Sequence, residues 1–187
     1  MKRSVFLLGL VLATVWAGEA RAQAGIERNP GYVNFADVES WFDQEATMEV
    51  NIKGALLKLV AEASRYDDPD LASMLGKLKA IQVRGYTLTP DEVDGISRRT
   101  SDFSRRLEGQ GWDTVARVRE DGEDVHMYVK AGEDAIDGLM VMVVAPGENE
   151  TVFVNIVGNI NPEEIGRIGR KFDIGPLDGA VVRERGR

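Results

Sequence analysis

A single histidine and two clusters of acidic residues are the side chains with the clearest potential for chemistry. His126 is the only histidine, and no cysteine is present, which excludes thiol catalysis, disulfides and cysteine-ligated zinc. Val125 and Met127 alternate with His126, so a strand here places the histidine on the opposite face, beside Tyr128. No nucleophile elbow, HExxH motif, phosphate-binding loop or dinucleotide fingerprint accompanies it. We therefore expect a structural role for His126 and predict no catalytic residue.

The acidic clusters, residues 67–70 and 120–124, carry carboxylates of the kind that bind calcium. Neither has the spacing of an EF-hand loop, and each falls where aspartate is favoured for local backbone reasons, at a helix start and at a hairpin tip. The sequence thus predicts no metal and no cofactor. A carboxylate pair for glycoside hydrolysis stays open, because any two acids can converge in a fold and nothing selects a pair.

The stretch Glu163 to Gly175 contains the letters IGRIGR, which resemble the GXXG loop of RNA-binding KH domains. That loop joins two helices, whereas this stretch follows a strand and the pair Asn161-Pro162, which is typical of a helix N-terminus. The glycines are then expected inside a helix over 161–172. Because the formal net charge of −8 also repels phosphate backbones, we predict no nucleic-acid binding.

The predicted helix over 161–172 separates two kinds of side chain. An apolar stripe is expected to pack on a sheet and consists of Ile165, Ile168 and Phe172. The outward side carries three basic residues, Arg167, Arg170 and Lys171. Such a group on an acidic protein is either a solvated face paired with neighbouring glutamates or a contact for an acidic partner. These three basic residues are the candidate partner contact.

The N-terminus has the three parts of a secretory signal peptide. Lys2 and Arg3 precede a short apolar run, and Ala20-Arg21-Ala22 supplies a small-x-small cleavage site. We predict a signal peptide over 1–22, cleaved after Ala22 with Ala24 as the alternative, and a linker over 23–31. The protein is then periplasmic or secreted. It has no stable membrane anchor after cleavage, since a lipoprotein signal needs a cysteine at that point.

Helix and strand signals alternate through the rest of the chain. Helices are expected near 36–42, 54–63, 68–78 and 89–109, and strands near 47–54, 80–88, 112–119, 125–130, 136–145 and 151–158. The predicted core-facing stripes of the last three helices are Leu56, Leu59, Val60 and Ala63; Leu71, Met74, Leu75 and Leu78; and Val93, Ile96, Thr100, Phe103 and Leu107.

Short connections between the last four strands predict an antiparallel meander, because crossovers need longer segments. The sequence therefore indicates a single α+β domain over 32–175, with a mainly antiparallel sheet and helices packed on one face. Residues 176–187 are predicted to form a flexible tail.

Several of these stretches together carry a family resemblance. The stretches are MEVNIKGALLKLV, LKAIQVRGYTL and VFVNIVGNINPEEIGRIGRKFDI. From about Val33 to Ile174 the chain resembles the domain-of-unknown-function 4252 family of exported bacterial proteins. The resemblance implies an envelope location and a signalling or accessory role, and it brings no established reaction, ligand or catalytic residue.

The signal-peptide pattern indicates export, and the helix and strand patterns indicate a folded domain. Because no set of catalytic residues accompanies them, the sequence favours an exported non-enzymatic domain. Its expected role is to bind or regulate another protein of the bacterial envelope, and its oligomeric state is left open. The first alternative is a carrier or sensor of a small apolar ligand, held beneath helices on the methionine-rich sheet. The second alternative is an unrecognised hydrolase.

Overall fold

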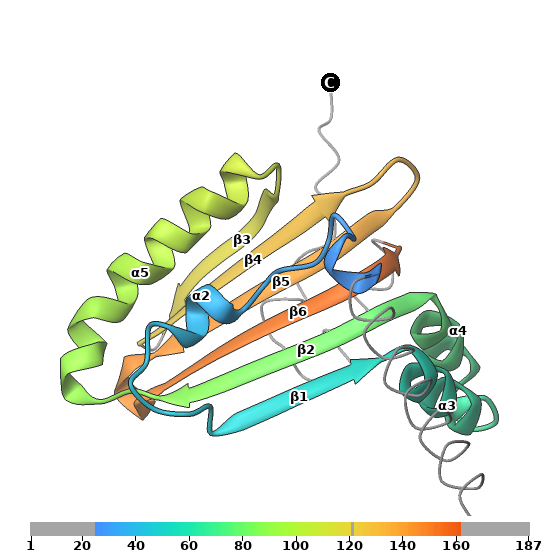
Figure 1. Ribbon diagram of the computed structural model, residues 1–187, viewed down its shortest axis with the longest axis horizontal. Helices are drawn as coiled ribbons and strands as arrows, with labels where there is room; N and C mark the ends of the chain where they lie inside the picture. Colours follow the sequence, from blue (N-terminus) through green and yellow to red (C-terminus); the bar gives the residue numbers. More distant parts are fainter. Residues whose placement is uncertain (1–24, 121, 162–187) are drawn as a thin grey trace, which may run out of the picture.

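The computed structural model describes residues 25–120 and 122–161, which contain one six-stranded antiparallel sheet in the order β1-β2-β6-β5-β4-β3 (Figure 1). The strands are β1 (Met48–Lys53), β2 (Leu78–Thr87), β3 (Asp113–Glu120), β4 (Glu123–Ala131), β5 (Ile136–Ala145) and β6 (Glu150–Ile160). The helices are α2 (Ala36–Glu39), α3 (Gly54–Ser64), α4 (Pro69–Lys77), α5 (Pro90–Gly109) and the 3-10 turn η1 (Pro146–Glu148). The predicted α+β class and four-strand meander are confirmed.

Short turns produce the meander. β3 ends at Glu120 and β4 begins at Glu123, and η1 connects β5 to β6, with Asn149 in the left-handed conformation at φ 55°. β5 is apolar on both faces and lies inside the sheet, as a continuous apolar run predicts. The earlier strands β1 and β2 join the other side of β6, so β1 and β3 are the two edges of the described sheet.

α5 has the strongest local signals and forms as predicted. At its N-terminus the backbone N–H and the hydroxyl of Thr89 both donate to Glu92 Oε2, each at 2.8 Å, while Pro90 occupies the first turn. Its buried residues follow helical spacing and are Ile96, Thr100, Phe103, Ser104 and Leu107. This apolar stripe holds α5 on the sheet.

α3 is a helix as predicted, but its predicted core-facing stripe is wrong. The residues that face the core are Leu57 and Ala61. The predicted residues are not buried: Leu56, Leu59, Val60 and Ala63. Apolar residues cover more than half of the circumference of this helix, so their spacing alone does not decide which side faces inward.

Two predicted helix boundaries also differ from the structure. α2 ends at Glu39 rather than at Phe42, although Phe42 is still buried. Leu78 is buried as predicted, but it begins β2 instead of continuing the helical stripe of α4. Both differences fall at element ends, where helical and extended backbone compete over one or two residues.

The buried side chains form two clusters on opposite faces of the sheet. α5 and α2 lie in front of the sheet in Figure 1, and their cluster includes Phe103, Tyr128 and Phe153. α3 and α4 pack at one end of the sheet, in a cluster that includes Met127 and Leu139. Because Met127 and Tyr128 are neighbours on β4, alternate residues of one strand contribute to the two clusters.

Residues 29–35, which we call the N-terminal strap, lie against β5 and β6 and are held by Asn155. The side chain of Asn155 is fully buried; its Oδ1 accepts from Val33 N–H at 3.0 Å, and its amide donates to Gly31 O at 3.0 Å. A Cβ on Gly31 would lie 2.0 Å from the carbonyl oxygen of Asp137, so only glycine allows this approach.

Candidate functional site

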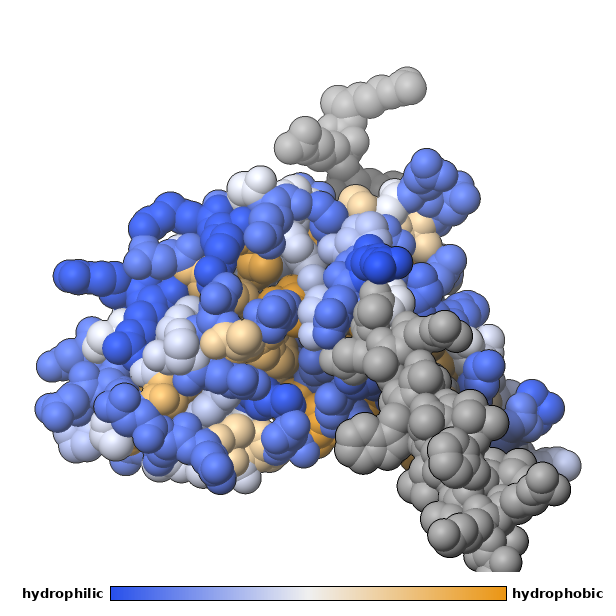
Figure 2. Space-filling view, in the orientation of Figure 1, coloured by the Kyte–Doolittle hydropathy of each residue, from blue (hydrophilic) through white to orange (hydrophobic). Residues whose placement is uncertain are grey.

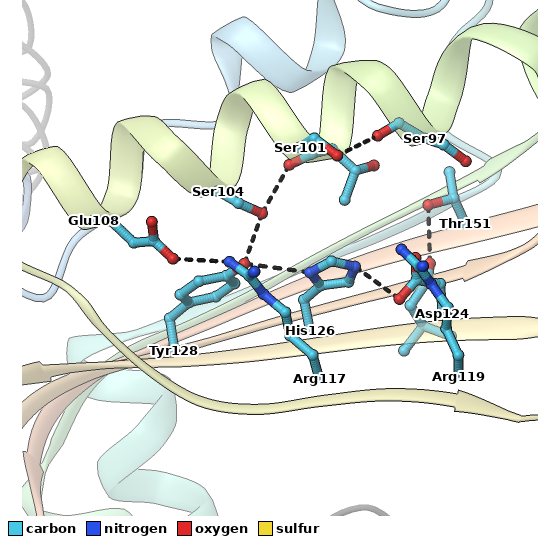
Figure 3. Close-up of polar contacts among 12 residues, drawn as sticks. Ser97, Ser101, Ser104, Glu108, Arg117, Arg119, Asp124, His126, Tyr128 and Thr151 are labelled. Atoms are coloured by element: carbon cyan, nitrogen blue, oxygen red, sulfur yellow. Dashed lines mark hydrogen bonds and ion pairs between the residues drawn. The ribbon is translucent and has the colours of Figure 1, made fainter.

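A row of polar side chains runs along β4 beneath α5 (Figure 3). Asp124, His126 and Tyr128 occupy alternate positions, so they point to the same face of the sheet, and we call them the β4 polar row. His126 is 5% exposed and Tyr128 is 0% exposed. The predicted position of His126, beside Tyr128 and opposite Val125 and Met127, is confirmed.

The inner end of the β4 polar row is hydrogen-bonded to α5. The Tyr128 hydroxyl donates to Ser104 Oγ at 2.6 Å, and the Ser104 hydroxyl donates to the carbonyl oxygen of Thr100 at 2.8 Å. His126 Nδ1 lies 3.3 Å from the Tyr128 oxygen. Since Tyr128 has given its one proton to Ser104, the histidine must donate here, which requires a proton on Nδ1.

The outer end of the row is charged. His126 Nε2 lies 2.8 Å from Asp124 Oδ1, a close contact that lacks the alignment of a hydrogen bond. Asp124 also pairs with Arg119 at 3.0 Å. Next to the row, Arg117 donates to Glu108 of α5 at 2.8 Å, and its hydrogen bond with Tyr128 raises the pKa of the arginine.

Histidine between a carboxylate and hydroxyls is a combination that acid–base and nucleophilic catalysis use. A catalytic hydroxyl must reach its substrate, however, and those of Tyr128 and Ser104 lie between α5 and the sheet (Figure 3). Each of these hydroxyls is also engaged by a protein partner. The geometry therefore supports a structural task, the attachment of α5 to β4.

The two acidic clusters make local contacts. Asp68 Oδ1 accepts from Leu71 N–H at 3.0 Å and so caps α4, whose first turn begins with Pro69, as the sequence indicates. In the second cluster, Asp124 is the carboxylate that pairs with Arg119. Across residues 25–120 and 122–161, no three His, Cys, Asp or Glu side chains are grouped to hold a metal ion.

Three open hollows on the described surface each contain an ion pair between an arginine and a carboxylate. One lies between the N-terminal strap and α5, where Arg106 contacts Asp37 at 2.7 Å. Another lies between α3 and α4 and contains a pair 2.6 Å apart, Arg65 with Glu62. The third, beside β1 and β2, contains Arg84 and Glu49, 2.9 Å apart. None of the three includes the β4 polar row in its lining.

Exposed apolar side chains gather on β1, α3 and the residues after α3. The exposed large hydrophobic residues of the described chain are Met48, Leu56, Leu59, Val60, Tyr66 and Val115. Five of these six lie within residues 48–66, and Leu59 is 65% exposed. We call Leu56, Leu59 and Val60 the apolar face of α3. The face with α5 differs, because Figure 2 shows mainly hydrophilic residues there, with hydrophobic residues near its centre.

The basic residues predicted as a partner contact lie outside the described residues: Arg167, Arg170 and Lys171. The predicted helix over 161–172 lies there as well, apart from Asn161. Sequence reasoning missed the attachment of α5 through Tyr128 and the buried clamp at Asn155. The signals were present: polar residues at every second position of β4, and one asparagine within the apolar strand TVFVNIVG.

Comparison with known proteins gives one match. The family model described as Domain of unknown function (DUF4252) matches residues 39–168. No curated protein and no solved structure matches the chain. Among the helices that the structure describes, none is long and apolar enough to cross a membrane.

Proposed function

Because this chain belongs to the family described as Domain of unknown function (DUF4252), a description that assigns no reaction, we propose a function from the residues of the chain itself. We propose an exported, non-enzymatic domain that binds another protein of the bacterial envelope through the apolar face of α3. The observation that carries the proposal is the concentration of exposed apolar side chains within residues 48–66. An exposed apolar patch, such as the one that Leu56, Leu59 and Val60 form on one side of α3, marks an interaction site.

The apolar face of α3 suits a helical or grooved partner. Leu56, Leu59 and Val60 stand at positions i, i+3 and i+4, the spacing of anchors in helix-in-groove recognition. Burying one such side chain contributes about 1.5–3 kcal/mol when it passes fully out of water. The partner is therefore a protein segment with an apolar face of its own, since charged segments would lose hydration without compensation.

Two further observations favour binding over catalysis. The only histidine of the chain is buried under α5 and held by its neighbours. Each of the three hollows has its arginine in an ion pair with a neighbouring carboxylate, so none presents an unpaired arginine to a substrate. The described hollows are open to solvent, whereas a carrier of an apolar ligand needs an enclosed pocket, so the carrier alternative gains no support.

The location in this proposal rests on the signal-peptide pattern of residues 1–22. We expect N-terminal sequencing of the exported protein to begin at Gln23. Recovery of a chain that still begins at Met1 in the membrane fraction would remove the exported location from the proposal.

Site-specific photo-crosslinking in cells tests the partner contact. A photoreactive amino acid at Leu59 should yield a specific crosslinked protein, whereas the same probe at Arg98, on the exposed side of α5, should not. The protein identified by mass spectrometry is then purified and titrated. Leu59→Glu should weaken its binding at least about tenfold, and Lys58→Glu, an exposed neighbour on α3, should change it less than about threefold.

Equal crosslinking at both positions, or equal affinity of the Leu59→Glu and Lys58→Glu variants, would show that α3 is not the contact. Unfolding curves of both variants exclude loss of the fold as the cause of weaker binding, because both positions are exposed in the folded chain.

A further inference from the structure

The two edges of the described sheet differ in how they are protected. β3 carries a register irregularity between Thr114 and Ala116, and bulges of this kind twist an edge away from other chains. β1 pairs with β2 in continuous register over all its residues, from Met48 opposite Gly85 to Lys53 opposite Ala80. It contains no proline and no bulge. Among the strands that the structure describes, β1 is therefore an edge on which another strand can add.

The sequence of β1, MEVNIK, separates its side chains by face. Val50 and Ile52 are partly buried on one face, and Ile52 packs with the cluster that α3 joins. Glu49, Asn51 and Lys53 lie on the other face. One face of β1 is thus apolar and the other polar. On the polar face, Glu49 and Lys53 have opposite charges and each lies two residues from Asn51.

We propose that β1 pairs with β1 of a second copy of this chain, antiparallel and centred on Asn51. A two-fold axis perpendicular to the sheet puts the same face of both copies on the same side of the joined sheet. Only registers in which the opposing residues come from the same face of β1 are therefore allowed. In the register centred on Asn51, each Glu49 lies opposite Lys53 of the second copy. The two-fold axis forms this opposite-charge pair twice.

The same register also matches the apolar face of β1. Val50 lies opposite Ile52 of the second copy, which is a favourable pairing of β-branched residues. Met48, which is 46% exposed in the single chain, comes opposite Gly54 at the start of α3. Registers centred one residue earlier or later form no Glu49–Lys53 pair. The alignment at Asn51 is therefore the one that the charges select.

Glu49 and Lys53 both already have contacts within their own chain, and these are compatible with the pairing, because an ammonium group has three donors and a carboxylate can accept from more than one cation. The carboxylate of Glu49 lies 2.9 Å from Arg84 Nη2 on the neighbouring strand β2, and its side chain is still 60% exposed. A carboxylate has room for two cationic partners, one on each side. Glu49 then lies between Arg84 of its own chain and Lys53 of the second copy. The pairing joins the two sheets into one, without any change in the fold of either copy.

This inference goes beyond the proposed envelope partner, because it concerns the β1 edge and not the apolar face of α3. Sedimentation velocity of the purified exported protein, at concentrations from about 1 to about 100 μM, measures self-association directly. The wild-type chain should form a dimer that dissociates on dilution. Glu49→Lys and Lys53→Glu should each weaken self-association about tenfold or more, because each turns two attractive pairs into repulsive ones.

Mixing the two variants is the decisive experiment. In a mixed dimer, positions 49 and 53 are both basic in the Glu49→Lys chain and both acidic in the Lys53→Glu chain, so every pair is again attractive. The equimolar mixture should recover wild-type affinity, and the double variant Glu49→Lys/Lys53→Glu should do so alone. Thermal unfolding curves confirm that each variant is folded, since loss of the contact with Arg84 in Glu49→Lys has its own effect.

A wild-type chain that stays monomeric throughout this range overturns the inference. Single variants that associate as tightly as wild type overturn it as well, and so does a mixture that stays monomeric. Leu59→Glu, on the apolar face of α3, separates the two proposals. If Leu59→Glu no longer dimerises while Glu49→Lys and Lys53→Glu still do, self-association occurs through α3. That result contradicts the β1 pairing.

Discussion

Two buried tyrosines on the same face of the sheet differ in the fate of their hydroxyl groups. Tyr128 donates to Ser104 Oγ and lies within reach of His126. Tyr86 stacks on Phe42 with ring centroids 3.9 Å apart, but its buried hydroxyl has no partner among the described residues. An unsatisfied buried hydroxyl costs free energy, whereas a satisfied one contributes modestly, so the same substitution should act differently at the two sites.

We therefore predict opposite effects for one chemical change at these sites. Tyr128→Phe removes the acceptor of His126 Nδ1 and the donor to Ser104, and it should lower the free energy of unfolding by about 1–3 kcal/mol. Tyr86→Phe should be neutral or should stabilise the chain by up to about 1 kcal/mol. Urea titrations followed by circular dichroism give both values. Equal losses in the two variants would contradict the role assigned to the β4 polar row.

Glu92 at the start of α5 connects stability to pH. Hydrogen bonding by the Thr89 backbone N–H is the main cause that lowers the pKa of Glu92 below its ordinary 4.5. Because the pKa is lower in the folded chain, the carboxylate contributes stability above pH 4.5, and this contribution is lost as the pH falls through the folded value. Glu92 is largely solvated, so the contribution is reduced by screening.

Glu92→Gln keeps an oxygen acceptor but cannot ionise. At pH 7 the wild-type chain should melt about 2 °C above this variant, and the difference should shrink toward zero near pH 3. Asp91→Asn, which removes a charge from the same turn, is the control and should show a smaller difference. A gap between wild type and Glu92→Gln that stays constant from pH 7 to pH 3 would contradict the hydrogen-bond assignment.

At the scale of the element, α3 presents apolar residues on two sides and buries only one of them. Leu57 is 2% exposed and Leu59 is 65% exposed, although they are two residues apart on one helix. Leu57→Ala should lower the free energy of unfolding by about 2–5 kcal/mol, because it opens a cavity under the helix. Leu59→Ala should change it by less than about 0.5 kcal/mol.

Chemical denaturation of these two variants tests which side of α3 faces the core. Similar losses in both would mean that Leu59 is covered in the folded protein, and the proposed partner surface would fall with it. The result also checks the correction to the predicted stripe, which assigned Leu59 to the core and omitted Leu57.

The contrast between α5 and α3 shows what patterning could and could not predict. α5 has a capped start at Thr89 and a single apolar stripe among charged residues, so spacing determines which side is buried. α3 has no such contrast, because apolar residues occupy most of its circumference. The strands of the meander were also predictable. Alternation of apolar and polar residues identifies the strands, and connections this short allow only antiparallel pairing of consecutive strands.

The candidate site was less predictable than the fold because it depends on contacts between distant elements. Alternation could place Asp124, His126 and Tyr128 on one face of a strand. It could not show that α5 lies above them and brings Ser104 to the tyrosine, since that requires the packing of the whole layer. The exposure of one side of α3 likewise depends on its packing, and the edge position of β1 depends on the order of strands in the sheet.

At the scale of the whole molecule, Asn155 joins the two ends of the described chain. Asn155→Leu keeps the number of side-chain heavy atoms but leaves the Val33 N–H and the Gly31 carbonyl without their partner. It should lower the free energy of unfolding by about 2 kcal/mol or more. Hydrogen exchange should speed up at Val33 while the amides of central β5 remain protected. Unchanged exchange at Val33 would show that the strap is held by other contacts.

The clamp at Asn155 also fixes the order in which the chain can finish folding. The hydrogen bonds of Asn155 to Val33 and Gly31 span 122 and 124 residues of sequence. A ribosome adds residues at about 5–20 per second, so the strap leaves it on the order of ten seconds before its binding site exists. During that interval the strap remains undocked, and under the proposed export a chain in that condition can still be threaded through a pore. The synthesis of β6, the last strand in the described part of the chain, thus ends the interval in which the strap has no binding site.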